Sequence, residues 1–146
     1  MSIFSFIKEA GEKVIDLLTP GNAHASDQLK EHVAKVGLGN PNITTEVDGD
    51  KVTVKGEVAT QEEKEKILLA LGNISGVATV DDQITVTGPA VTAARFVVVK
   101  AGDTLSAIAK VEYGDGSKYM KIFEANKPML SDPNKIYPGQ TLRIPE

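Results

Sequence analysis

The sequence has 146 residues, of which 41% are hydrophobic and 25% are charged, and its formal net charge is −4. This length allows one domain or two small ones with limited cores, and the acidic balance leaves no basic stripe for a nucleic acid partner. Cysteine is absent, which excludes disulfides, thiolate metal sites and a cysteine nucleophile.

Residues 2–18 have the apolar spacing of an amphipathic helix, which Gly11 interrupts and could end near Ala10. Charged residues break the apolar run at Lys8-Glu9, and neither a basic start nor a small-residue cleavage site is present, so a secretory signal is not indicated. No segment approaches the roughly 20 apolar residues that span a bilayer. We expect a cytoplasmic protein without a membrane span, whose N-terminal helical segment, residues 1–22, docks on the next domain.

Residues 26–88 predict the order helix, strand, strand, helix, strand, at 26–36, 43–48, 51–57, 61–71 and 77–87. Asp48-Gly49-Asp50 separates two alternating apolar runs and indicates a hairpin turn. Asp81 and Asp82 are adjacent on a strand and point to opposite faces, so we expect a solvated strand edge rather than a metal site.

The helix at 61–71 carries clear end signals. Thr60 and Glu63 have the spacing of a capping box, and Gly72 stands where a left-handed C-cap glycine belongs. The next residues, Gly72-Asn73-Ile74-Ser75-Gly76, can turn back so that carbonyl oxygens of the helix end converge. Such a group of neutral oxygens suits a large monovalent cation. The alternative is an ordinary helix cap followed by a turn.

The αββαβ order, the GEV that follows the second strand and the GNISGVATVDDQI corner resemble the BON domain, which implies that fold for residues 23–88. Residues 89–94 are small and include Pro89, which is typical of a linker.

Residues 95–146 predict a strand at 96–100, helices at 104–112 and 117–126, and a strand at 141–144. Tyr137-Pro138-Gly139-Gln140 has the residues of a type II turn before the last strand. From end to end this segment resembles a LysM domain (βααβ), a family that binds N-acetylglucosamine polymers. The resemblance implies a glycan groove formed by Gly102, Asp103, Thr104, Leu105, Ile136, Tyr137 and Pro138. These residues could instead only hold the fold, because a protein without an export signal would not meet the cell wall.

The combination of SFIKEAGEK, LGNISGV, IFEANKPML and KIYPGQ resembles the family of bacterial cytoplasmic potassium binding proteins over nearly the whole chain. The resemblance implies a monomeric α+β protein, a K⁺ sensor or buffer that becomes ordered and compact when backbone carbonyls bind the ion. The implied ligands are the carbonyls of Ile7, Ala10, Glu12, Gly72, Ile74 and Gly76.

Two other function classes stay open from the sequence. One is a peptidoglycan-binding LysM module, and the other is an envelope-stress adaptor that uses the surface of either domain for a protein partner. An enzyme is not expected, because His24 and His32 are the only histidines and neither lies in a catalytic or metal-ligand pattern.

Overall fold

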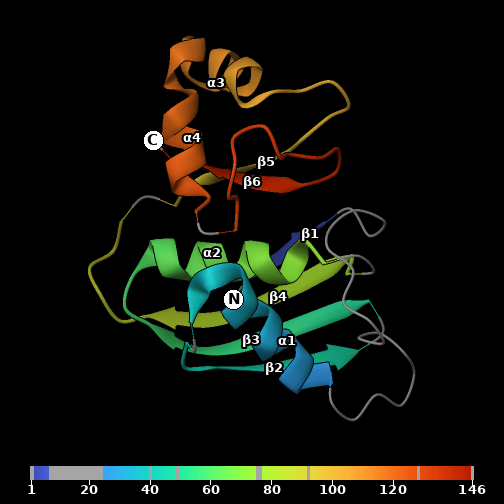
Figure 1. Cartoon of the computed structure of the whole chain (residues 1–146). Coiled ribbons are helices and arrows are strands. Elements are labelled where there is room, and N and C mark those ends of the chain that lie inside the picture. The colour runs from blue at the N-terminus through green and yellow to red at the C-terminus, as the bar shows by residue number, and fades with distance from the viewer. Residues whose placement is uncertain are drawn as a thin grey trace.

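The computed structural model describes residues 2–6, 25–39, 41–48, 50–74, 77–91, 93–127 and 129–145. These residues form two domains that are stacked on each other (Figure 1). The first domain, residues 2–6 and 25–86, contains a four-stranded sheet, and the second domain, residues 95–145, contains a two-stranded sheet. The predicted α+β class is confirmed.

The first domain follows the predicted order of elements. Its parts are α1 (Ala25–Val33), the π-helical turn η1 (Ala34–Leu38), β2 (Ile43–Asp48), β3 (Lys51–Val58), α2 (Gln61–Gly72) and β4 (Thr79–Val86). Strands β2 and β3 pair antiparallel up to Asp48 opposite Lys51, which confirms the predicted hairpin, although Gly49 lies outside the described residues. Strands β3 and β4 are parallel, with α2 as the crossover between them.

The N-terminus corrects one prediction. Residues Ser2–Ser5 form strand β1, not the start of a helix, and pair antiparallel with β4 to give the sheet order β1-β4-β3-β2. The physical reason is that β4, paired with β3 on one side, presents an open edge on the other, and edge pairing satisfies backbone groups on both strands. The remainder of the predicted helix, residues 7–18, lies outside the described residues.

Helices α1 and α2 lie across the same face of the four-stranded sheet (Figure 1). The core of the first domain lies between the two helices and this face of the sheet. Leu29 and Val33 of α1, Leu68 and Leu71 of α2 and Val80 of β4 are almost completely buried there. The alternating burial of β4 reflects the period of a strand with one face on this core.

The sequence predicted that Asp82 lies on a solvated strand edge, and the structure contradicts this. Its side chain is 2% exposed, lies 3.0 Å from the Lys64 ammonium and accepts a hydrogen bond from the Ile84 N–H at 2.9 Å. Asp81, on the opposite face, is partly exposed and lies 3.9 Å from Lys51. The prediction was wrong for Asp82 because its side chain lies on the face of β4 that packs on the core, beside Lys64 of α2.

The second domain consists of β5 (Arg95–Val98), α3 (Leu105–Tyr113), the 3-10 turn η2 (Gly116–Lys118), α4 (Tyr119–Ala125) and β6 (Thr141–Ile144). The predicted second helix therefore begins with a 3-10 turn. Gly139 has φ of 89°, and the Gln140 N–H donates to the Tyr137 carbonyl at 3.1 Å, so the predicted type II turn is confirmed.

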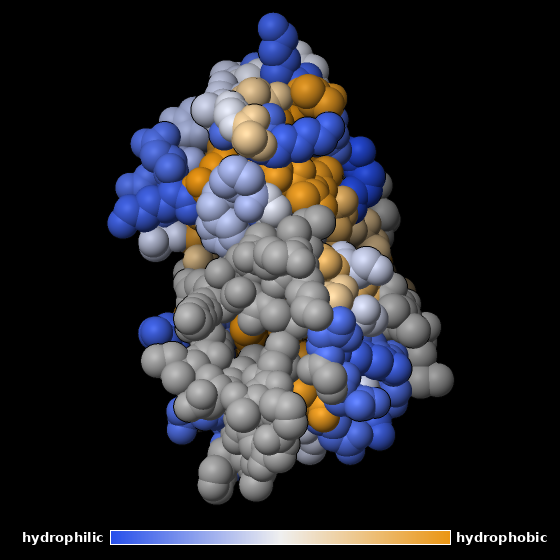
Figure 2. Space-filling model, turned by 90° about the vertical axis from the view of Figure 1, so that its right-hand side faces the viewer, coloured by the Kyte–Doolittle hydropathy of each residue, from blue (hydrophilic) through white to orange (hydrophobic). Residues whose placement is uncertain are grey.

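Some apolar surface of the second domain stays exposed. Figure 2 shows apolar atoms on the upper part of one face, over the second domain, between hydrophilic side chains. Val98 and Val111 are 42% and 81% exposed. None of the described helices is both long enough and apolar enough to span a bilayer.

Strand β6 joins the two domains because both of its faces are buried. Leu142 and Ile144 point into the core of the second domain. Thr141 and Arg143, on the opposite face, are 4% and 7% exposed and bond to α2 of the first domain. The second domain is thus docked along α2.

Candidate cation site

The candidate site is the corner between α2 and β4. The last helical turn closes with a hydrogen bond from the Asn73 N–H to the Leu69 carbonyl at 2.9 Å. The Val77 N–H donates to the Ile74 carbonyl at 3.1 Å, so the chain turns back at once. Carbonyls at a helix end lack partners within the helix. The Ile74 side chain is completely buried and anchors this backbone.

Gly72 is not a left-handed cap, which corrects the sequence prediction. It is the last residue of α2 and is not among the glycines with positive φ, and the C-cap residue is Asn73 with φ of −85° and ψ of 35°. A glycine is needed here for a different reason, because a Cβ at position 72 would collide with the ring of Phe6. At the other end of α2, the Thr60 hydroxyl accepts from the Glu63 N–H at 3.1 Å, which is the N-cap half of the predicted capping box.

Phe6 brings the N-terminal segment to the corner. Its N–H donates to the Ala78 carbonyl at 2.8 Å, and its ring, which is 8% exposed, lies against Gly72. Phe6 directly precedes Ile7 in the sequence. Phe6, the last described residue before the predicted ligand Ile7, therefore lies against the corner.

Of the predicted ligands, the structure describes Gly72 and Ile74, which lie together in the corner. The other four predicted ligands lie outside the described residues: Ile7, Ala10, Glu12 and Gly76. Within the described ranges, no group of three His, Cys, Asp or Glu side chains could hold a metal ion. The two predicted ligands that the structure describes would offer neutral backbone oxygens, a type of ligand that fits a weakly hydrated monovalent cation better than Mg²⁺ or Ca²⁺.

Asn73 fixes the corner to the second domain, a role that the sequence reasoning missed. Its amide nitrogen donates to the Thr141 carbonyl at 2.8 Å, and its amide oxygen accepts from the Thr141 N–H at 2.9 Å. The side chain thus pairs with β6 as another strand would. A buried strand edge needs such a partner, because unpaired backbone groups are costly to bury.

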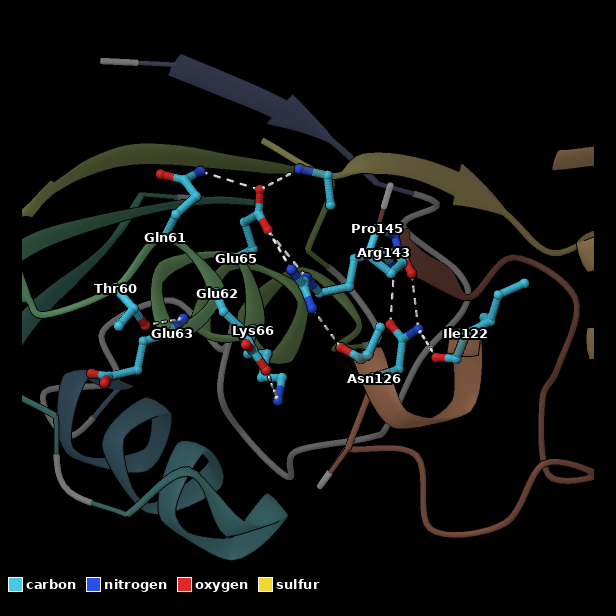
Figure 3. Close-up of polar contacts among 12 residues, drawn as sticks. Thr60, Gln61, Glu62, Glu63, Glu65, Lys66, Ile122, Asn126, Arg143 and Pro145 are labelled. Carbon is cyan, nitrogen blue, oxygen red and sulfur yellow. Dashed lines mark hydrogen bonds and ion pairs between the residues drawn. The ribbon is translucent and has the colours of Figure 1, made fainter. Parts of the chain in front are cut away.

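A second interdomain contact joins Glu65 of α2 to Arg143 of β6 (Figure 3). Glu65 Oε1 accepts from Arg143 Nε at 3.1 Å and from Nη2 at 2.8 Å, and the two side chains are 4% and 8% exposed. Glu65 Oε2 accepts from the Ala94 N–H at 2.8 Å and from Gln61 at 3.1 Å. The buried carboxylate is therefore fully hydrogen-bonded.

Arg143 is also held from its own domain. Its Nη1 donates to the Ala125 carbonyl at 2.9 Å, and its backbone N–H and carbonyl both pair with the side chain of Asn126 (Figure 3). The sequence alone does not indicate this contact. Arg143 alternates with the apolar residues Leu142 and Ile144, a pattern that predicts a solvent-facing side chain, and its cover comes from α2 of the other domain.

The predicted glycan residues mostly have structural roles. Gly102 has φ of 85°, the Asp103 carboxylate accepts from the Lys100 N–H at 2.9 Å, and the Thr104 hydroxyl accepts from the Ala107 N–H at 3.0 Å as the cap of α3. Leu105 is buried in the core and Ile136 packs against it. Asp103 lines one hollow of the second domain and Tyr137 lines another, and the glycan groove stays a prediction. Pro138 is exposed in the turn.

Comparison with known proteins gives matches over both domains. The family model of the BON domain matches residues 22–88, and that of the LysM domain matches residues 97–145. The chain is 53% identical over 150 aligned positions to the Potassium binding protein Kbp of Escherichia coli O6:H1, covering 100% of this chain and 99% of that protein.

Shorter stretches match two other proteins. One is an uncharacterized protein of Deinococcus radiodurans, 53% identical over 47 residues, which are 32% of this chain and 18% of that protein. The other is the uncharacterized protein YqbP of Bacillus subtilis, 37% identical over 67 residues, which are 40% of this chain and 31% of that protein. The predicted order of a BON domain followed by a LysM domain is confirmed.

Proposed function

Because the chain belongs to the family of the potassium binding protein Kbp, with a BON domain followed by a LysM domain, we propose that it binds K⁺ at the end of α2. The ligands are backbone carbonyls from the two segments named above, 7–12 and 72–76. The protein is a binding protein and not an enzyme, and it acts as a sensor or buffer of K⁺ in the cytoplasm.

The contact between Phe6 and Gly72 is the observation that carries this proposal. It joins the N-terminal segment to the helix end, where carbonyls lack partners within the helix. Neutral carbonyls can replace the water around K⁺, whereas smaller or divalent cations lose more hydration energy than such a group of dipoles returns.

Linkage then explains how the ion orders the protein. If the ion binds only when both segments are in place, its binding free energy adds to the stability of that arrangement. At an ion concentration 100 times the dissociation constant, the gain in the free energy of unfolding is about 2.7 kcal/mol. K⁺ therefore makes the chain more compact as well as more stable.

Thermal melting in a choline background, titrated with KCl or with NaCl at matched ionic strength, tests the proposal. We expect a saturable rise in Tm with K⁺ that Na⁺ does not reproduce. Equal effects of the two salts would overturn the proposal, and retention on insoluble peptidoglycan would then favour glycan binding by the LysM domain.

The variant Gly72→Ala tests the position of the site. Its Cβ displaces the Phe6 ring, so we expect the K⁺-specific rise in Tm to shrink severalfold or disappear. Gly102→Ala is the control, because it strains a turn of the LysM domain, where φ is 85°, and destabilises the chain away from the corner. A full K⁺ response in Gly72→Ala would place the ion elsewhere.

A further inference from the structure

A cavity of about 420 Å³ lies between the two domains, on a side of α2 that faces α1 and the chain that follows α4. Its volume is in the range of small-molecule sites, roughly 300 to 1,000 Å³. Leu69, Ala70 and Leu130 form its apolar part, and all three are buried. The cavity adjoins the cation corner, since Asn73 lines it, but its other walls belong to different elements.

Gln140 presents a free hydrogen-bond donor to this cavity. The side chain is 7% exposed, and its Oε1 accepts from the Tyr137 N–H at 3.2 Å. A backbone N–H can only donate, so the contact identifies the oxygen and leaves Nε2 as the other end of the amide. Among the described residues, Nε2 has no hydrogen-bond partner. Nε2 itself is not among the described side-chain atoms that are both buried and without a partner, so water in the cavity reaches it, and a ligand acceptor can take the place of that water.

The charge of the lining has the sign that attracts anions. Lys135 is the formal cation there, and Ser131 adds a hydroxyl to the lining. None of the described lining residues is Asp or Glu, although the chain as a whole carries a net charge of −4. An ammonium, an amide N–H₂ and a hydroxyl together match the oxygens of a carboxylate.

We propose that this cavity binds a small organic carboxylate with an apolar body. The carboxylate lies between Gln140 and Lys135 at the polar side, and the apolar body packs on Leu69, Ala70 and Leu130. The bound ligand thereby accepts a hydrogen bond from Gln140 and covers the apolar part of the cavity. This site is distinct from the proposed K⁺ site and does not depend on it.

The test is a ¹H–¹⁵N NMR titration of the full-length chain at constant KCl. Phenylacetate is the probe, and phenylacetamide, its neutral isostere, is added separately at matched ionic strength. A probe of about ten non-hydrogen atoms is expected to bind in the millimolar range. We expect saturable shifts of the Gln140 side-chain N–H₂ and of the backbone amides of Ser131 and Lys135 with phenylacetate alone.

Two variants assign the polar contacts. Gln140→Glu keeps the acceptor for the Tyr137 N–H and replaces the donor by a negative charge, so phenylacetate binding should be lost. Lys135→Gln, at an exposed position where folding is not at risk, should weaken binding by roughly twofold to fivefold. Lys118→Gln is the matched control, an exposed lysine of the same domain that does not line the cavity.

Three results would overturn the proposal. The first is the absence of saturable shifts with phenylacetate. The second is an equal response to phenylacetamide, which would mean that the cavity binds the apolar ring and does not recognise the negative charge. The third is unchanged binding in Lys135→Gln relative to Lys118→Gln.

Discussion

Replacing Arg143 by Met should destabilise the protein more than any surface substitution. The guanidinium gives Glu65 two hydrogen bonds, at 3.1 and 2.8 Å, inside an interface where the two side chains are 8% and 4% exposed. Without it the carboxylate keeps only Gln61 and the Ala94 N–H as donors. Breaking a buried ion pair by removing one partner costs about 3–5 kcal/mol, and we expect Arg143→Met to lower the free energy of unfolding by that amount.

The double variant Glu65→Gln, Arg143→Met distinguishes two costs of removing Arg143. One is the lost attraction of the ion pair, and the other is the burial of an unpaired Glu65 carboxylate. Glutamine keeps an acceptor oxygen for the Ala94 N–H, while the buried negative charge is gone. If the stranded carboxylate dominates the cost, the double variant recovers most of the stability and lies within about 2 kcal/mol of the wild type. Additive losses in the two single variants would contradict this account.

Urea unfolding followed by far-UV circular dichroism provides the measurement, since the chain has no Trp. Lys127→Met is the matched control, because Lys127 and Glu124 form a pair at 3.4 Å with side chains 46% and 60% exposed, and such pairs contribute at most about 1 kcal/mol. A cost for Arg143→Met no larger than that of Lys127→Met would refute the reasoning that the interdomain pair is buried and decisive.

Two further predictions concern single side chains. Asn73→Ala removes both hydrogen bonds to Thr141 and leaves the backbone N–H of that buried residue unpaired, so the free energy of unfolding in urea should fall by about 1–3 kcal/mol. Hydrogen bonds from the Ser117 hydroxyl and N–H hold the pKa of Asp115 below its ordinary value of 3.8. Its stabilising contribution is therefore present above about pH 4 and lost as pH falls through the lowered pKa. Ser117→Ala should raise that pKa towards 3.8 in a carboxyl NMR titration, and an unchanged value would contradict the assigned cause.

Local signals in the sequence were sufficient for most elements. The cap at Thr60, the hairpin from Asp48 to Lys51 and the turn before β6 depend on a few adjacent residues, and the structure has all three. Each uses a backbone geometry that particular residue types favour. The order of elements follows from these signals and from apolar periodicity.

Contacts between distant parts of the chain explain the predictions that were wrong. The apolar residues at the N-terminus fit a helix by spacing, but β1 pairs with the open edge of β4, about 75 residues further along the chain. Asp82 is buried because it lies on the face of β4 that α2 covers, and its partner Lys64 belongs to that helix. Local periodicity carries no information about which strand pairs with which edge.

The candidate site shows the same limit at two adjacent residues. The glycine at 72 was recognised, but for the wrong reason, because its lack of a Cβ serves the Phe6 ring and not a left-handed turn. Asn73 was not singled out at all, since its partner, Thr141, belongs to the other domain. All six predicted ligands stay predictions, and four of them, Ile7, Ala10, Glu12 and Gly76, lie outside the described residues.

The end of α2 is therefore where three parts of the chain meet. Phe6 of the N-terminal segment contacts Gly72, and Thr141 of the LysM domain forms two hydrogen bonds with Asn73. The last turn of α2 is therefore in contact with both of these parts of the chain. A carbonyl of that turn can move only if one of these contacts changes, because closely packed elements shift together and not independently. Any ligand that draws those carbonyls together must consequently act on the N-terminal segment and on the LysM domain at the same time.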